Sequence, residues 1–186
     1  MKVTTARPTL PMTYHEYALL PQDRNRYEVL DGELYMTPSP SCHHQAVVTH
    51  LGSTLLQHVL AHGLGMVFVA PLDVVLTETN ILQPDILFLR AGRVPPKASK
   101  NITVAPDLVV EVVSPASMEQ DREITMQVYA RHGVAHYWIV DPDARTFEIY
   151  ALSGTTYEKV VAFSGDATAT TSLFPGLAIP LARFWA

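Results

Sequence analysis

Residues 107–115, DLVVEVVSP, decide the fold expected for this chain. Five of the six residues 108–113 are leucine or valine, and such an apolar run is typical of a β-strand buried on both faces. Glu111 interrupts the run. A buried, isolated carboxylate costs several kcal/mol unless it pairs with a cation or takes up a proton. The sequence therefore predicts a central strand that carries an acid with a specific partner.

A second acid stands at a similar place, 26 residues before Glu111. Asp85 follows a proline within ILQPDILFL (81–89), which we predict to be another strand. A connection of this length allows the two strands to lie side by side, about 5 Å apart. At about 4 Å, two carboxylates repel each other by about 4 kcal/mol at an effective dielectric of about 20. Sharing a proton or binding a hard cation such as Mg²⁺ relieves this repulsion.

Other interpretations of the two acids stay open at this point. An acid at the start of a strand, such as Asp85, is often an exposed residue at the sheet edge. A glutamate in the middle of a strand, such as Glu111, can face solvent on one side of an antiparallel sheet.

The segments around these strands alternate between helical and extended patterns. Residues 26–36, RYEVLDGELYM, predict a hairpin because Asp31-Gly32 is a strong two-residue turn signal. Residues 41–63 carry an apolar face at helical spacing and predict the longest helix. The order predicts an α/β fold, with a mixed β-sheet core flanked by helices and an N-terminal β-hairpin. The other expected elements are a short helix (14–20), one bent or two short strands (66–76), a basic surface loop (90–106), a helix (117–133) and three strands (136–141, 146–152 and 157–163).

Composition and charge limit the class of protein. The chain has 186 residues, of which 48% are hydrophobic and 17% charged, as expected for a single globular domain. We expect a flexible lead over residues 1–12 and one domain over residues 13–186. No apolar run reaches the length of about 18–20 residues that a membrane span needs, and Cys42 has no second cysteine to pair with, so we expect a cytoplasmic protein without membrane contact. The net charge of −5 speaks against tight non-specific binding of DNA.

Four segments share a more specific pattern: QPDILFL (83–89), PDLVVEVVSP (106–115), DREITMQVY (121–129) and GVAHYWIVDPDARTFEIY (133–150). Together with the hairpin and the start of the long helix, they resemble the bacterial Uma-type family of endonucleases, within the PD-(D/E)xK restriction-endonuclease-like superfamily. The resemblance runs from about Tyr14 to Tyr150. It implies a restriction-endonuclease-like fold, metal-dependent cleavage of phosphodiester bonds and a nucleic-acid substrate, with DNA as the expected form.

The resemblance also implies site residues, position by position. Asp85 matches the acid of the PD motif and Glu111 matches the second acid. In the superfamily the carbonyl of the next residue, here Val112, often helps to bind the metal, so these three are the expected ligands of Mg²⁺ or Mn²⁺. Glu28 resembles an additional acid of the family, and His44 resembles a histidine at the start of the long helix. The alternatives are an exposed hairpin position for Glu28 and a hydrogen-bonded core or helix-start histidine for His44.

One position departs from the family pattern. The Uma-type family supplies a lysine from the helix after the second acid, four residues after an aspartate and four before a tyrosine, which here are Asp121 and Tyr129. This chain has Thr125 in that place. A hydroxyl cannot carry the positive charge, and losing such charge stabilisation typically costs about 10²- to 10³-fold in rate. Three alternatives remain for the missing lysine: its charge comes from Arg122, it comes from Lys100 in the basic loop, or no residue supplies it.

These features predict a metal-dependent nuclease in which a metal-activated water hydrolyses the phosphodiester bond. Thr125 supports an alternative, a catalytically impaired family member that binds nucleic acid or a protein partner. A metal-dependent hydrolase of another substrate is a third possibility. The apolar edge of the last strands, including YEKVVAF (157–163), makes a homodimer plausible.

Overall fold

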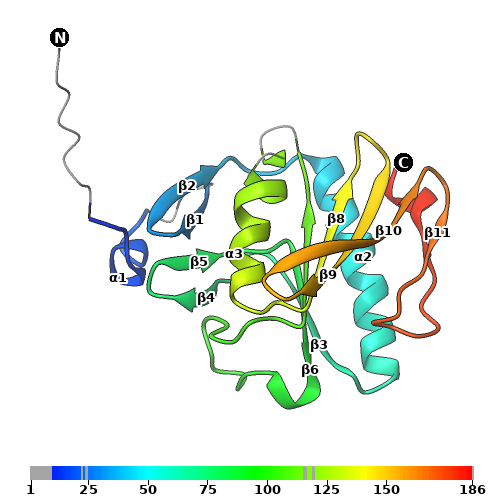
Figure 1. The fold of residues 1–186 in the computed structure, drawn as a ribbon, viewed down its shortest axis with the longest axis horizontal. Coiled ribbons are helices and arrows are strands. Elements are labelled where there is room, and N and C mark those ends of the chain that lie inside the picture. The colour runs from blue at the N-terminus through cyan, green and yellow to red at the C-terminus, as the bar shows by residue number, and fades with distance from the viewer. Residues whose placement is uncertain (1–9, 22, 24, 115–116, 119, 186) are drawn as a thin grey trace, which may run out of the picture.

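A computed structural model describes residues 10–21, 23, 25–114, 117–118 and 120–185 (Figure 1). Its central sheet consists of six strands: β3 (Gly65–Val69), β6 (Ile86–Arg90), β7 (Leu108–Val112), β8 (His136–Asp141), β9 (Thr146–Ser153) and β10 (Thr156–Ser164). Their order in space is β10-β9-β8-β7-β6-β3. β7 and β8 are parallel and the other neighbouring pairs of this sheet are antiparallel, so the predicted mixed sheet is confirmed.

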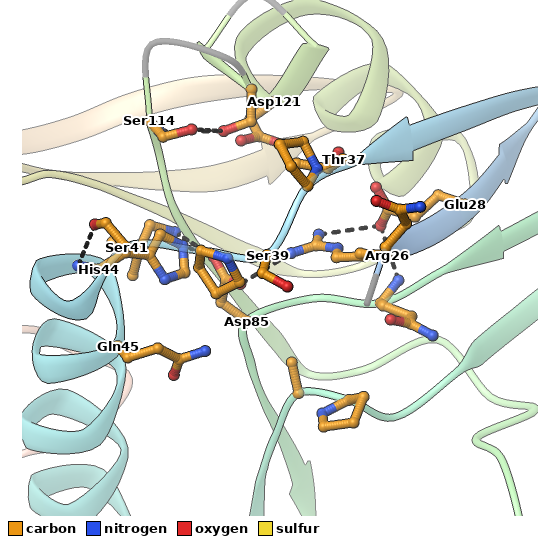
Figure 2. A pocket seen from close by; sticks show the side chains of 18 of the residues that line it. Arg26, Glu28, Thr37, Ser39, Ser41, His44, Gln45, Asp85, Ser114 and Asp121 are labelled. Atoms are coloured by element: carbon orange, nitrogen blue, oxygen red, sulfur yellow. Dashed lines mark hydrogen bonds and ion pairs between the residues drawn. The ribbon is translucent and has the colours of Figure 1, made fainter. Parts of the chain in front are cut away.

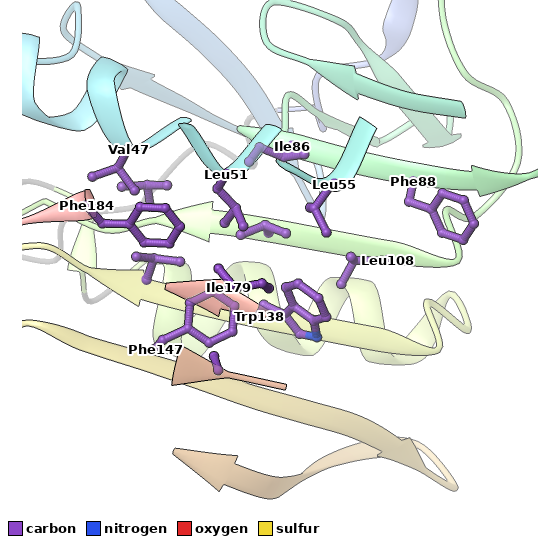
Figure 3. Close-up of a cluster of buried hydrophobic side chains, with 14 of the residues drawn as sticks. Val47, Leu51, Leu55, Ile86, Phe88, Leu108, Trp138, Phe147, Ile179 and Phe184 are labelled. Carbon is purple, nitrogen blue, oxygen red and sulfur yellow. The ribbon is translucent and has the colours of Figure 1, made fainter. Parts of the chain in front are cut away.

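Helices α2 (Cys42–Ala61) and α3 (Met126–Arg131) cover opposite faces of this sheet. All five residues of β7 are buried, and alternate side chains point to opposite faces. Leu108 packs in the cluster beneath α2 (Figure 3), whereas Val109 packs with Tyr129 of α3. Glu111 has the same parity as Val109, so its side chain belongs to the face that α3 covers. The predicted buried strand is therefore correct, and its acid lies in the interior.

A smaller sheet holds the predicted hairpin. Its strands are β1 (Arg26–Leu30), β2 (Glu33–Thr37), β4 (Val74–Thr77) and β5 (Asn80–Leu82), in the order β2-β1-β5-β4. Asp31 and Gly32 have φ angles of 51° and 83°, as the tight turn requires. The N–H of Met12, within the expected lead, donates to the carbonyl of Gly32 at 2.9 Å and so ties this part of the lead to the turn. The rest of the expected lead, residues 1–9, lies outside the described residues.

The prediction of one strand over residues 81–89 is wrong. β5 ends at Leu82 in the small sheet, and β6 begins at Ile86 in the central sheet. Pro84 interrupts the strand because it has no N–H to donate to a neighbouring strand. Residues 66–76 likewise form two strands, β3 and β4, one in each sheet. The break at residues 83–85 therefore places Asp85 at the junction of the two sheets.

Only part of the helix predicted over residues 117–133 is an α-helix. A π-helical segment, η2 (Gln120–Thr125), precedes α3, and residue 119 lies outside the described residues. π-Helical turns are frequent at functional sites. The first helix, α1, is shorter than predicted. The remaining elements are α1 (Tyr14–Tyr17), η1 (Ala91–Arg93), β11 (Thr168–Ala169), β12 (Ile179–Pro180) and η3 (Leu181–Phe184).

Within the described part of the chain, no helix has the length and apolar character needed to cross a membrane. β10 forms one edge of the central sheet, the edge on which the homodimer was expected. The homodimer itself stays a prediction.

Candidate active site

Asp85 is buried at the junction of the two sheets, and each of its carboxylate oxygens has a partner (Figure 2). Oδ2 accepts a hydrogen bond from the N–H of Val112 at 2.8 Å and lies 3.2 Å from Nε2 of His44. Oδ1 lies 2.9 Å from Nη1 of Arg26. One end of the carboxylate is thus fixed by a backbone amide and an imidazole, and the other end faces a cation.

Glu111 lies beside Asp85, as the spacing of the two strands predicts. Its side chain comes from the middle of β7 and the residue is 0% exposed. Oε2 accepts a weak hydrogen bond from the N–H of Asp85 at 3.3 Å and lies 3.5 Å from Nη2 of Arg26. Oε1 is buried and has no hydrogen-bond partner in the described part of the chain. An exposed position is therefore excluded for both acids.

Glu28 is also buried, so the alternative of an exposed hairpin position is wrong. Oε1 accepts a hydrogen bond from the N–H of Gln83 at 2.8 Å and lies 3.1 Å from Nη2 of Arg26. Oε2 accepts from Nε2 of Gln120 at 3.1 Å. These contacts hold Glu28 against both the junction of the sheets and the η2 segment.

His44 lies in the first turn of α2, whose start Ser41 caps by accepting the N–H of His44 at 3.1 Å. The imidazole of His44 points toward Asp85. Its other ring nitrogen, Nδ1, is buried without a hydrogen-bond partner among the described residues. The structure thus brings together four predicted residues, Glu28, His44, Asp85 and Glu111, whose catalytic roles stay predictions.

Arg26 is the residue that sequence reasoning missed. Its guanidinium contacts the carboxylates of Glu28, Asp85 and Glu111 at 3.1, 2.9 and 3.5 Å. Burial alone lowers the pKa of Arg26, but these three acids outweigh burial and hold it well above its normal value. One signal was present in the sequence, because residues 26 and 28 are two apart on a strand and so share a face.

The environment shifts the pKa values of the two central acids in opposite directions. Burial raises the pKa of Glu111 well above its usual range, although the charge of Arg26 opposes this. Burial acts in the same way on Asp85, but the hydrogen bond from His44 and the charge of Arg26 outweigh it and lower the pKa. A pair of acids with such different environments is typical of acid–base sites.

Asp121 extends this acidic group from the η2 segment. Burial, followed by the negative charge of Glu28, raises the pKa of Asp121 to about 7. Asp121 is the aspartate that precedes the lysine position in the family pattern, and it borders the same pocket as Asp85.

Thr125 occupies the lysine position in a fully enclosed place. The residue is 1% exposed, and neither its Oγ1 nor the hydroxyl of Tyr129 has a hydrogen-bond partner among the described residues. The two cations considered as substitutes lie elsewhere. Nη2 of Arg122 contacts Oε1 of Glu148 at 2.8 Å, and neither Arg122 nor Lys100 borders the pocket.

Three of the acids, Glu28, Asp85 and Asp121, border a pocket of about 550 Å³, whereas the fully buried Glu111 does not line it. Such a volume is in the usual range for ligand sites, about 300–1,000 Å³. One wall is the segment between β2 and α2, and others come from β1, the end of β7 and the η2 segment (Figure 2). The pocket is lined by residues that include Arg26, Glu28, His44, Asp85, Val112 and Asp121.

The donor set fits a hard divalent cation in its chemistry. Mg²⁺ and Mn²⁺ prefer oxygen ligands, and the buried, unpaired Oε1 of Glu111 beside Asp85 is an oxygen that lacks a partner. In the described ranges, however, no three His, Cys, Asp or Glu side chains are already arranged around a common point for a metal. The guanidinium of Arg26 lies among these carboxylates instead. Val112 contributes its backbone N–H, which donates a hydrogen bond to Asp85. Metal binding by its carbonyl stays a prediction.

Comparison with known proteins agrees with the fold. The model of the family Uma2, described as putative restriction endonuclease, matches residues 14–182. A solved structure, that of a putative nuclease belonging to DUF820 from Anabaena variabilis ATCC 29413, is similar with a TM-score of 0.77. Its sequence identity is 23%, over 94% of this chain and 98% of that chain, so the likeness shows a shared fold. Comparison with curated proteins finds no match.

Proposed function

The chain belongs to the Uma2 family of putative restriction endonucleases, and from this premise we propose that it is a divalent-metal-dependent nuclease. The observation that carries the proposal is the pair Asp85 and Glu111. Asp85 directly precedes β6, borders the pocket and donates its N–H to Glu111 on the neighbouring β7, and Oε1 of Glu111 is buried and unpaired within the described structure. The similar fold of the DUF820 protein, which is itself described as a putative nuclease, supports it.

The expected ligands of the ion are Asp85 and Glu111, with the backbone of Val112. A Mg²⁺ or Mn²⁺ ion held there supplies an activated water and stabilises negative charge on a phosphate oxygen. The chain's own residues prepare this arrangement. His44 and the N–H of Val112 fix one oxygen of Asp85, which leaves the other oxygen directed toward Arg26 and the pocket.

Glu28 and Asp121 complete the acidic wall of the pocket. Glu28 is held by Gln83 and Gln120, so its carboxylate keeps a fixed position relative to Asp85. The pKa of Asp121, raised to about 7, allows this side chain to gain or lose a proton near neutral pH. Because Asp121 also borders the pocket, we assign it a proton-transfer role beside the predicted site residues.

The decisive experiment is cleavage of supercoiled and single-stranded DNA by the purified protein in Mg²⁺, Mn²⁺ or EDTA. We expect cutting that requires the metal and is lost in Asp85→Asn and Glu111→Gln. Asp107→Asn is the matched control, because Asp107 is a buried carboxylate that pairs with Arg93 at 2.6 Å and does not border the pocket. Cleavage that persists in EDTA or in Asp85→Asn would refute the proposal.

A second candidate function rests on Thr125, which leaves the lysine position without a charge. In this case the protein binds nucleic acid or a protein partner and does not cut. The Thr125→Lys variant separates the two functions. Activity that appears in Thr125→Lys while the wild type is inactive would identify a disarmed nuclease. Equal activity in both proteins would show that cleavage does not require a lysine at this position.

A further inference from the structure

We propose that the guanidinium of Arg26 is an exchangeable counter-ion, which competes with a divalent cation for Asp85 and Glu111 and binds a nucleic-acid phosphate once it is released. The inference rests on the proposed function, because it takes these two acids as the residues that hold the ion. It assigns to Arg26 the positive charge that Thr125 cannot supply.

The distribution of contacts at the two acids shows where the competition arises. Oδ2 of Asp85 already has two partners, Val112 and His44, so Oδ1 is the oxygen available to an ion, and Oδ1 faces Nη1 of Arg26 at 2.9 Å. Oε2 of Glu111 faces the same guanidinium. A cation bound by both acids would therefore lie beside Arg26, and like charges repel strongly in a partly buried site.

The surroundings of the pocket contain few other sources of positive charge. Of the described residues that border it, Arg26 is the single lysine or arginine. Arg122 contacts Glu148 instead. Phosphate groups are bound most effectively by guanidinium groups, which present several N–H donors in a fixed plane. Arg26 is thus placed to neutralise the acids before the ion arrives and to meet a phosphate afterwards.

The structure also offers Arg26 a route between these two partners. Its side chain is 21% exposed and borders the pocket, so the guanidinium reaches the pocket from a largely buried position. Glu28, two residues along β1, contacts Nη2 at 3.1 Å and is itself held by Gln83 and Gln120. Glu28 can therefore retain the guanidinium while its contacts with Asp85 and Glu111 are given up.

Binding of Mn²⁺ in the absence of nucleic acid tests the competition. We expect Arg26→Met to bind Mn²⁺ at least about tenfold more tightly than the wild type in a calorimetric titration, because the competing charge is gone. Arg93→Met is the control, since it removes an arginine from another buried acid, Asp107, outside the pocket. Its Mn²⁺ affinity should equal that of the wild type. An unchanged or weaker affinity in Arg26→Met would overturn the proposal.

Two further measurements keep the test decisive if Arg26→Met does not fold without the ion. Arg26→Lys keeps a positive charge with a shorter reach, and we expect its Mn²⁺ affinity to rise about threefold or more; no rise would count against exchange. In the wild type, addition of Mg²⁺ should shift the Nε–Hε NMR signal of Arg26, identified by its absence in Arg26→Lys. A signal that stays in place through saturation with Mg²⁺ would overturn exchange.

The second half of the proposal is tested with a short single-stranded oligonucleotide in Ca²⁺. We expect Arg26→Met to bind it about tenfold more weakly than the wild type, and Arg93→Met to bind it equally well. Equal binding by Arg26→Met would refute the phosphate contact. Tighter Mn²⁺ binding by Arg26→Met together with an inactive wild type would uphold the exchange and refute the nuclease. Cleavage that depends on Asp85, with an unchanged Mn²⁺ affinity in Arg26→Met, would uphold the nuclease and refute the exchange.

Discussion

Asp121 is kept at a cost to stability, and its replacement by asparagine should reveal that cost. In the unfolded chain its pKa is 3.8, whereas burial and the charge of Glu28 raise it to about 7 in the folded protein. Because the folded state holds the proton more tightly, the carboxyl is tolerated at low pH and destabilises the fold as the pH rises from about 4 to about 7. The difference corresponds to about 4 kcal/mol above pH 7, at about 1.4 kcal/mol for each pH unit.

The assay is urea unfolding of Asp121→Asn and the wild type at pH 4, 6 and 8 in EDTA. We expect the variant to be more stable by about 2–4 kcal/mol at pH 8 and nearly equal at pH 4, because asparagine cannot ionise. Asp107→Asn should behave in the opposite way and lose stability, since Asp107 gives up its ion pair with Arg93. A gain in Asp121→Asn that is the same at pH 4 and pH 8, or absent at pH 8, would refute the reasoning.

Three other perturbations follow from packing and charge. Burial raises the pKa of Glu148, but hydrogen bonds from an arginine, a lysine and a tyrosine outweigh burial and lower the pKa to about 2. The stabilisation from these contacts is therefore complete above about pH 4.5 and is lost as the pH falls toward 2. Glu148→Gln should cost about 1–2 kcal/mol in urea unfolding at pH 7. Leu55→Ala should cost about 2–5 kcal/mol, and the exposed Leu60→Ala less than about 0.5 kcal/mol. Gly65→Ala should lower the midpoint of thermal unfolding because its Cβ would overlap a backbone carbonyl of β6, whereas Gly92→Ala, which meets open space, should not.

The sequence predicts the elements of the fold better than it predicts their assignment to sheets. The apolar run around Glu111 and the turn at Asp31-Gly32 are local patterns, and both predictions are confirmed. The change of sheet at residues 83–85 depends on which neighbours each half finds, and these lie far away in the chain. The π-helical segment before α3, QDREIT, contains a single apolar residue, Ile124, so hydrophobic periodicity does not distinguish it from an α-helix.

In the candidate site, too, one contact could be predicted from the sequence and another could not. The adjacency of Asp85 and Glu111 could be predicted, because each acid stands next to or within an apolar run and a loop long enough to bring the two runs side by side joins them. The position of Arg26 could not, since its contacts with these acids join residues 59 and 85 positions away and depend on how the small sheet meets the central one. The two-residue spacing of Arg26 and Glu28 on one strand indicates that these two are neighbours, but nothing in the sequence indicates the contacts of Arg26 with Asp85 and Glu111.

The junction of the two sheets has a consequence for how the protein opens. Arg26 and Glu28 come from the N-terminal hairpin, whereas Glu111 comes from the central sheet. Detachment of the hairpin would separate the cation from Asp85 and Glu111, and it would also withdraw Leu30 from the core that α3 covers. A proteolytic fragment that begins after β2 would thus keep both acids and lose Arg26, and we expect it to be less stable than the whole domain. The hairpin therefore supplies both the charge that neutralises the two acids and a part of the core that α3 covers.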